Sequence, residues 1–226
     1  KCEKIIKYKI HNSLKVLLST SGSTADPKFV KLTKKNLIHN SKGIIKSLGI
    51  NKESYPITSL PLSYSYGLSI FNSHIFLGNK VFVSNLNIFE KKFWSYINKF
   101  NITTFGGVPI FYDMLMRSEF MNLNNSSLKY LTLAGGRIDK NTFIKLKNVM
   151  NIKKIKFFLM YGQTESTARI SVKQVGIDDE ISIGAPIQGT KMFIGNKKYE
   201  NLKDGHSGEI KIKSGSIYKG YAHSYK

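Results

Sequence analysis

The chain has 226 residues, of which 41% are hydrophobic and 12% aromatic, so it can bury a full core and is not a disordered protein. Its formal net charge is +21, but only three of the 35 basic residues are arginine and no block of five or six like charges occurs. Because arginine dominates the recognition of bases and phosphates, this composition disfavours nucleic-acid binding as the main role.

The cysteine count and the hydropathy of the chain limit the class of protein further. The single cysteine excludes an internal disulfide, and no Cys and His pair has the spacing of a zinc site. No apolar run approaches the ~20 residues that a membrane-spanning helix needs, and no signal-like apolar segment follows the first residues. We therefore expect a cytoplasmic protein with no membrane span.

An apolar run near the N-terminus leads into the most distinctive stretch, residues 17–28. This stretch contains five hydroxyl residues around Gly22 and ends in Lys28, a combination that favours a tight turn lined by donors and a mobile positive charge. It predicts either a loop that binds a polyphosphate or a solvated turn between two strands. It is not a Walker-type loop, because Pro27 precedes the lysine and Phe29 follows it.

Beyond this stretch, apolar residues alternate between helical and strand spacing. Thr33 can cap a helix that Gly49 ends, Pro109 can open another at its first position, and Asp139 can cap a third. The expected helices are 34–48, a segment ending near 77, 88–100, and those begun by Pro109 and Asp139. The expected strands are 57–60, 80–83, 102–105, 128–133 and 156–160.

This alternation predicts an α/β fold with a largely parallel sheet and flanking helices. In such sheets, ligands bind beyond the carboxyl ends of the strands. Loops of small residues follow the predicted strands in just that position, so we expect them to meet in one site. These loops come after Leu18, Leu60, Phe105, Leu133 and Met160.

From about residue 171 the chain changes to short apolar runs separated by Gly, Pro and Asp-Gly turns. This pattern predicts antiparallel β structure, half of a small barrel. The runs are 181–183, 191–194, 209–213 and 217–218. We therefore expect an α/β subdomain over 1–172, which holds the converging loops, and a β-rich subdomain over 173–226.

Five motifs follow one another through nearly the whole chain. They are T-S-G-S-T-A-D-P-K-F (20–29), G-G-R-I (135–138), Y-G-Q-T-E (161–165), G-A-P-I-Q-G (184–189), and G-E-I with G-Y (208–210 and 220–221). In order and rough spacing they resemble the adenylate-forming superfamily of acyl- and aryl-CoA synthetases, peptide-synthetase adenylation domains and luciferases. The chain departs from that pattern where Ala25 and Phe29 replace two loop glycines and Tyr64 replaces a histidine.

The resemblance implies an AMP-forming acid–thiol ligase. Such enzymes join a small carboxylic acid to ATP, with Mg²⁺, and release pyrophosphate. In the full-length protein the acyl group then passes to CoA or to the phosphopantetheine of a carrier protein. The chain stops before the family's T-G-D motif, hinge and lysine-bearing C-terminal domain, so it resembles a fragment of the large N-terminal domain. We expect weak or no activity from this fragment alone.

The same resemblance assigns roles to individual residues. It implies catalytic roles for Thr164, Glu165 and Lys28, with Glu165 as the magnesium ligand. The implied ATP contacts are Thr20, Ser21, Gly22, Ser23, Thr24, Lys28, Gly135, Gly136, Arg137, Tyr161, Gly162, Gln163 and Thr164. The implied acid pocket consists of Tyr64, Tyr66, Gly67, Gly106, Gly107 and Val108.

Plainer interpretations of these residues stay open. Glu165 can be a surface carboxylate after a turn, Thr164 a helix cap, and Tyr161 a core aromatic at a strand end. Tyr64 and Tyr66 fit packing as well as they fit a pocket. At the level of function, the alternatives are a catalytically incomplete nucleotide-binding module and a basic nucleic-acid-binding protein.

Overall fold

The computed structural model describes residues 10–20, 28–122, 127–195, 201–203 and 205–222. Its helices are α1 (Lys34–Leu48), α2 (Ser65–Phe76), α3 (Lys91–Lys99), α4 (Pro109–Leu115) and α5 (Lys140–Ile152), with short 3₁₀ turns at Glu119–Asn122 (η1) and Thr164–Ser166 (η2). Its strands are β1 (Leu14–Thr20), β2 (Lys28–Thr33), β3 (Thr104–Gly107), β4 (Tyr130–Leu133), β5 (Lys156–Tyr161), β6 (Ser171–Val175), β7 (Ala185–Pro186), β8 (Thr190–Ile194), β9 (Ile210–Ser214) and β10 (Tyr221–Ala222). None of these helices is long and apolar enough to cross a membrane.

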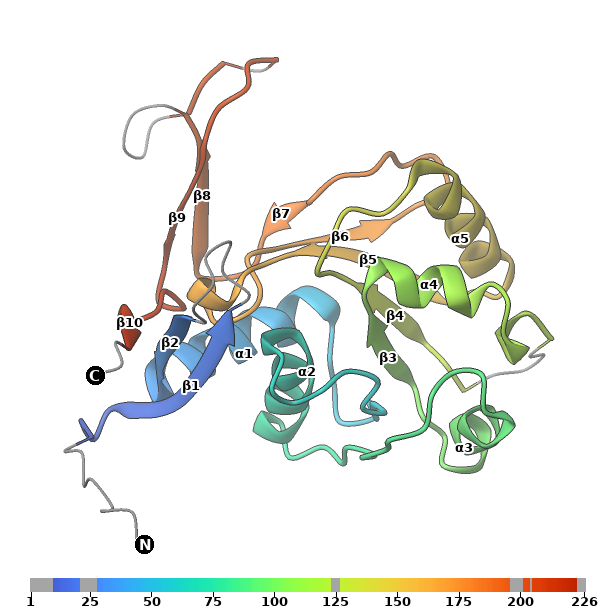
Figure 1. Cartoon of the computed structure of the whole chain (residues 1–226). Helices are drawn as coiled ribbons and strands as arrows, with labels where there is room; N and C mark the ends of the chain where they lie inside the picture. Colours follow the sequence, from blue (N-terminus) through green and yellow to red (C-terminus); the bar gives the residue numbers. More distant parts are fainter. Residues whose placement is uncertain (1–9, 21–27, 123–126, 196–200, 204, 223–226) are drawn as a thin grey trace, which may run out of the picture.

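A five-stranded sheet in the order β3-β4-β5-β6-β7 forms the centre of the fold (Figure 1). Strands β3, β4 and β5 are parallel, whereas β6 and β7 run antiparallel to their neighbours. The sheet is therefore mixed, and the expectation of a largely parallel sheet is corrected. The reason is local: the connection 162–170 between β5 and β6 is shorter than the roughly dozen residues that a parallel crossover needs.

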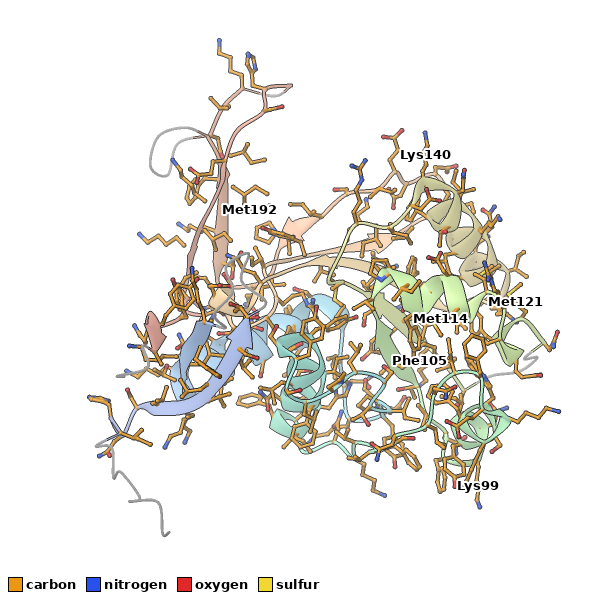
Figure 2. The ribbon with its side chains drawn as sticks, viewed as in Figure 1. Lys99, Phe105, Met114, Met121, Lys140 and Met192 are labelled. Atoms are coloured by element: carbon orange, nitrogen blue, oxygen red, sulfur yellow. The ribbon has the colours of Figure 1, made fainter. Side chains whose placement is uncertain are left out.

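Helices cover both faces of the central sheet, and strand periodicity decides which residue meets which helices. Phe157 and Leu159 of β5 join the core cluster that contains residues of α3, α4 and α5. Their neighbours Phe158 and Met160 point to the opposite face and join residues of α1 and α2. Figure 2 shows Phe105 of β3 inside the molecule, while Lys99 and Lys140 extend outward. A strand buried on both faces is apolar at consecutive positions, as these strands are.

A second, smaller sheet carries the ends of the hydroxyl-rich stretch. β1 and β2 form an antiparallel pair in which Thr20 faces Lys28, and β10 pairs with the other edge of β2. Leu18, Val30 and Leu32 form its buried core, against which Leu37 of α1 and Leu68 of α2 pack. This packing anchors both ends of the stretch beside α2. Residues 21–27 lie outside the described part of the chain.

Two expected strands are reduced to single bridges. Pro56 bridges Thr104 of β3, and Ile57 bridges Phe82, all in parallel sense. The segments at 57–60 and 80–83 thus extend the sheet past β3 by one residue pair each, and the expectation of full strands was wrong. A proline has no N–H to donate to a ladder, which limits pairing at this edge.

The C-terminal region is antiparallel as expected. β8 and β9 pair along their whole length and project from the body of the molecule (Figure 1). The runs 181–183 and 217–218 are not strands, and the described residues do not close a barrel. β6, at the expected boundary between subdomains, is hydrogen-bonded into the central sheet. The division at 172 stays a prediction.

The local helix signals are confirmed. Thr33 and Asn36 form a reciprocal capping box at the start of α1, and Gly49 ends that helix with φ 65°. Pro109 occupies the first turn of α4, and the Asp139 carboxylate accepts hydrogen bonds from the backbone N–H groups of Asn141 (2.8 Å) and Thr142 (3.1 Å). These ends form as expected because each depends only on neighbours in the sequence.

The cap of α5 gives a first testable expectation. Asp139→Ala should lower the free energy of unfolding by about 1 kcal/mol, because two N–H groups of the first turn lose their acceptor. Asp139→Asn keeps an acceptor and should lose less. Urea denaturation of the two variants and the wild type measures the difference. Equal midpoints for wild type and Asp139→Ala would contradict the role of this cap.

Candidate active site

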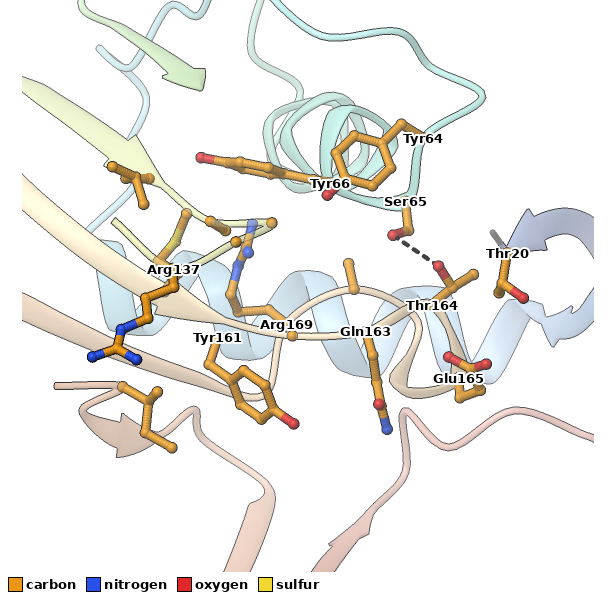
Figure 3. A pocket seen from close by; sticks show the side chains of 18 of the residues that line it. Thr20, Tyr64, Ser65, Tyr66, Arg137, Tyr161, Gln163, Thr164, Glu165 and Arg169 are labelled. Carbon is orange, nitrogen blue, oxygen red and sulfur yellow. Dashed lines mark hydrogen bonds between the residues drawn. The ribbon is translucent and has the colours of Figure 1, made fainter. Parts of the chain in front are cut away.

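A cavity of about 980 Å³ opens beyond the carboxyl ends of β4 and β5. Its wall combines residues from distant parts of the sequence: the facing ends of β1 and β2, the segment that leads into α2, the loops after β4 and β5, and Tyr221 of β10. Figure 3 shows this cavity from close by. Of the loops expected to converge at one rim, those after residues 60, 133 and 160 meet here with the described ends of the hydroxyl-rich stretch, whereas the loop after β3 does not line the cavity.

The Y-G-Q-T-E segment enters the cavity through a tight reversal of the chain. After Tyr161 at the end of β5, a Cβ at Gly162 would overlap the Ala168 carbonyl oxygen, so only glycine fits there. The returning strand is held by a hydrogen bond from the Ile170 N–H to the Tyr161 carbonyl (2.9 Å). Thr164 and Glu165 lie at the tip of this reversal, on the cavity wall.

A side-chain hydrogen bond joins two of the motifs. The Thr164 hydroxyl donates to the Ser65 hydroxyl oxygen, 3.2 Å away, at the first residue of α2 (dashed line in Figure 3). Ser65 is buried and fixed by the helix, so it holds the rotamer of Thr164. The Thr164 hydroxyl oxygen keeps lone pairs, and its hydrogen can turn toward a ligand in the cavity.

The Glu165 carboxylate is held from the other side by the second sheet. The Tyr221 hydroxyl donates to Glu165 Oε1 (2.8 Å), and the Glu165 carbonyl accepts a hydrogen bond from the Tyr218 backbone N–H (2.8 Å). This hydrogen bond to the carboxylate raises the pKa of the Tyr221 hydroxyl well above its ordinary value. Lys28 Nζ lies 5.5 Å from the centre of the Tyr221 ring, which brings the lysine to the same edge of the cavity.

The loop after β4 lies against Tyr64. Gly135 has φ 89°, and a Cβ there would stand 2.5 Å from the Tyr64 hydroxyl oxygen and 3.1 Å from a Val108 methyl carbon. Both the backbone conformation and the space therefore require glycine. The adjoining Arg137 is exposed and contributes to the cavity wall.

The two tyrosines at the start of α2, Tyr64 at its N-cap and Tyr66 in its first turn, differ in their exposure to the cavity. Their rings pack edge to face with centroids 6.2 Å apart. Tyr66 is 2% exposed, and its hydroxyl donates to the Thr132 carbonyl (2.7 Å). Burial raises the pKa of the Tyr66 hydroxyl to about 12, so it stays neutral. Tyr66 is thus mainly a packing residue of the wall, whereas Tyr64 is only half-buried and open to a ligand in the cavity.

The structure brings most of the predicted site residues together. Those on the cavity wall are Thr20, Lys28, Tyr64, Tyr66, Gly135, Gly136, Arg137, Tyr161, Gly162, Gln163, Thr164 and Glu165. Ser21, Gly22, Ser23 and Thr24 lie outside the described residues. Gly67, Gly106, Gly107 and Val108 are not on this wall.

Packing explains the glycines that lie off the wall. A Cβ at Gly67 would overlap the Pro61 carbonyl oxygen, and one at Gly106 would come within 2.7 Å of the Tyr66 hydroxyl oxygen. These glycines let α2 approach its preceding loop and the sheet closely. Their role in the acid pocket stays a prediction.

Three residues of the wall escaped sequence reasoning. Ser65 was hidden in a run of small and aromatic residues, and Tyr221 was noticed only as part of a G-Y pair. Arg169, one of three arginines, stands four positions after Glu165, yet its spacing gives no sign that it turns into the cavity. Each contacts a partner that is distant in sequence, and such contacts leave no local pattern.

The charges on the wall favour an anionic ligand. Among the described residues that line the cavity, Lys28, Arg137 and Arg169 are cationic and Glu165 alone is anionic. No cluster of three metal-ligating side chains occurs in the described part of the chain. A divalent cation at Glu165 would therefore complete its shell with water and ligand oxygens, as Mg²⁺ does with phosphates.

The chain belongs to the family of AMP-binding enzymes, whose sequence profile matches residues 9–222. This match confirms the resemblance to the adenylate-forming superfamily that the motifs indicated. Acid–thiol ligases are among its homologues.

Two curated relatives illustrate the range of the family. The chain is 24% identical over 210 residues to an oxalate–CoA ligase from Arabidopsis thaliana, covering 91% of this chain and 41% of that protein. It is 25% identical over 231 residues to a D-alanine–D-alanyl carrier protein ligase from Streptococcus agalactiae. That match covers 95% of this chain and 44% of that protein. The chain thus spans about two fifths of the length of these relatives.

A solved structure shows the same fold. The o-succinylbenzoate CoA synthetase from Bacillus subtilis, in complex with ATP and a magnesium ion, superposes with a TM-score of 0.78 at 24% identity. The match covers 91% of this chain and 42% of that chain. The likeness establishes an adenylate-forming fold for the described residues.

Proposed function

We propose that the protein containing this chain activates a carboxylic acid with ATP, forming an acyl-adenylate and pyrophosphate. The observation that carries this proposal is the convergence of segments from distant parts of the sequence on one cavity of cationic character. Family membership supports it, and so does the relative solved with ATP and magnesium. In the longer protein, CoA or the phosphopantetheine of a carrier protein would accept the acyl group, as the names of the two curated relatives suggest.

The wall residues fit ATP. The Gly135–Gly136 backbone lets an adenine ring approach closely, and the half-buried Tyr161 ring offers a stacking face. Thr20 and Lys28, at the facing ends of β1 and β2, would contact the outer phosphates. Phe29, where relatives have a glycine, is a strand residue paired with Ser19, so the ladder accommodates it.

Adenylation needs charge neutralisation and in-line positioning more than proton transfer. Mg²⁺ bound at Glu165 would neutralise phosphate charge. Tyr221 holds the Glu165 carboxylate in place by a hydrogen bond. The Thr164 hydroxyl, which donates its one hydrogen to Ser65 in the structure, would turn that hydrogen toward the α-phosphate and accept from the Ser65 hydroxyl instead. Lys28 adds a positive charge at the same edge.

The direct test is carboxylate-dependent ATP–pyrophosphate exchange by the protein that contains this chain, measured across a broad panel of acids. We expect exchange with a narrow set of acids, and weak or no exchange from residues 1–226 alone. A protein that exchanges with no acid of the panel would remove the proposal and leave a nucleotide-binding module as the better description.

A further inference from the structure

One cation on the cavity wall is buried without a counter-charge. Arg169 is 3% exposed, yet none of the ion pairs among the described residues includes it. Its Nε is buried without a hydrogen-bond partner. Its terminal Nη2 reaches the Ser69 hydroxyl oxygen only at 3.4 Å. The guanidinium therefore has unused donors at the cavity.

The surroundings fix the position of this guanidinium. It stacks on the Tyr66 ring with its central carbon 4.5 Å from the ring centre, and Tyr66 is itself anchored to Thr132. Asn40 fixes the backbone: its amide nitrogen donates to the Arg169 carbonyl (2.8 Å), and its oxygen accepts from the Arg169 N–H (3.2 Å). The orientation of the side chain is thus built before any ligand binds.

A buried charge without a partner is unfavourable by several kcal/mol, and arginine does not escape by losing its proton. Burial does lower the pKa of the Arg169 guanidinium from its ordinary value, in agreement with this penalty. The backbone contacts of this position need no arginine, and a hydrophobic side chain of similar size would fill the space. An anionic ligand group would offset the penalty, because a guanidinium binds a carboxylate through two parallel hydrogen bonds.

The ligand group is not a phosphate at the Glu165 end of the cavity. In the view of Figure 3, Arg169 lies beside Tyr66, and Thr164 lies between Arg169 and the side chains of Glu165 and Thr20. Tyr66 is the second residue of α2, whereas Thr20 and Lys28 lie at the facing ends of β1 and β2. The reacting carboxylate must meet ATP near Thr164, so the remainder of the acid extends toward Arg169.

We propose that Arg169 binds a second anionic group of the acid substrate, so that the substrate is a dicarboxylic acid or an acid of equivalent charge. This proposal rests on the proposed adenylation and names its substrate class. A simple alkyl or aryl acid would leave the arginine unpaired. A site with a buried polar group discriminates against ligands that cannot pair with that group, by factors of about 10² or more.

The experiment compares matched acids in ATP–pyrophosphate exchange: succinate with butyrate, adipate with hexanoate, and terephthalate with benzoate. The wild-type protein should favour at least one diacid over its partner by about a hundredfold in kcat/KM. Arg169→Met should lose that preference and Arg169→Lys should keep part of it. Arg117→Gln, an exposed arginine off the cavity, should behave as the wild type.

A second measurement separates this proposal from the one it rests on. The melting temperature of the wild type and of Arg169→Met is measured with and without each acid. A diacid should raise it for the wild type alone, even if no acid supports exchange. Two outcomes would overturn the role of Arg169 and leave adenylation standing. In one, the wild type exchanges faster with the monoacids than with the diacids; in the other, Arg169→Met prefers the diacids as strongly as the wild type does. If no acid supports exchange and no diacid raises the melting temperature of the wild type, the role of Arg169 is overturned as well.

Discussion

Glu165→Gln is expected to weaken the binding of magnesium–ATP by about a hundredfold, because the amide removes the only anionic group among the described residues of the cavity wall. The variant keeps the size of the side chain and can still accept the hydrogen bond from Tyr221. Isothermal titration of the chain with ATP in the presence of Mg²⁺ measures the effect. Glu165→Ala and Thr164→Ala extend the series to the loss of the whole group and of the neighbouring hydroxyl.

Two controls show whether the carboxylate acts through the metal. Titration without Mg²⁺ should give similar affinities for the wild type and Glu165→Gln, since the lost interaction is with the cation. Tyr221→Phe removes the hydroxyl that donates to Glu165. It should weaken the binding of ATP in the presence of Mg²⁺ by only about tenfold. If all variants bind magnesium–ATP as tightly as the wild type, the assignment of this cavity to the nucleotide is wrong.

Gly162→Ala is expected to lower the free energy of unfolding by more than about 3 kcal/mol, or to prevent folding. A Cβ at this position would overlap the Ala168 carbonyl oxygen and stand 2.8 Å from its carbon, so backbone must move. The backbone cannot move freely, because the Ala168 N–H donates to the Ser166 carbonyl (2.8 Å) and β5 pairs with β6 directly beyond.

Gly136→Ala is the matched control in the other glycine-containing loop. Its Cβ would meet first the Pro109 ring at 3.3 Å, which is a side chain and can shift slightly. We expect a change of less than about 1 kcal/mol. Urea denaturation followed by circular dichroism compares the two variants with the wild type. A Gly162→Ala protein with an unchanged midpoint would show that the reversal after β5 is not as tight as described.

Sequence reasoning was accurate where structure depends on near neighbours. The helix 34–48 was predicted at its observed bounds, because Thr33, Asn36 and Gly49 form its ends by contacts within four residues. Capping by Asp139 and the start of a helix at Pro109 follow from the same kind of local chemistry. One of the two interpretations of the hydroxyl-rich stretch placed it between two strands, and the strands on either side exist as β1 and β2.

Reasoning failed where a partner is far away in sequence. The apolar runs at 57–60 and 80–83 have strand composition, but the length of a strand is set by the ladder beside it, which offers only single bridges here. The resemblance places Gly106 and Gly107 in the acid pocket, and this role stays a prediction. What the sequence did not reveal is that a Cβ at these glycines would collide with the side chains of Tyr66 and Phe111.

By itself, the sequence determined the family of this protein and the segments that form its site, because five motifs in one order carry that information without coordinates. Only the tertiary structure decided which side chains act together. The pairs Thr164–Ser65 and Glu165–Tyr221 and the stack of Arg169 on Tyr66 join residues 56 to 103 positions apart. Such contacts arise from how α2 and the second sheet pack against the β5–β6 reversal, and a buried charge becomes visible as unpaired only once that packing is known.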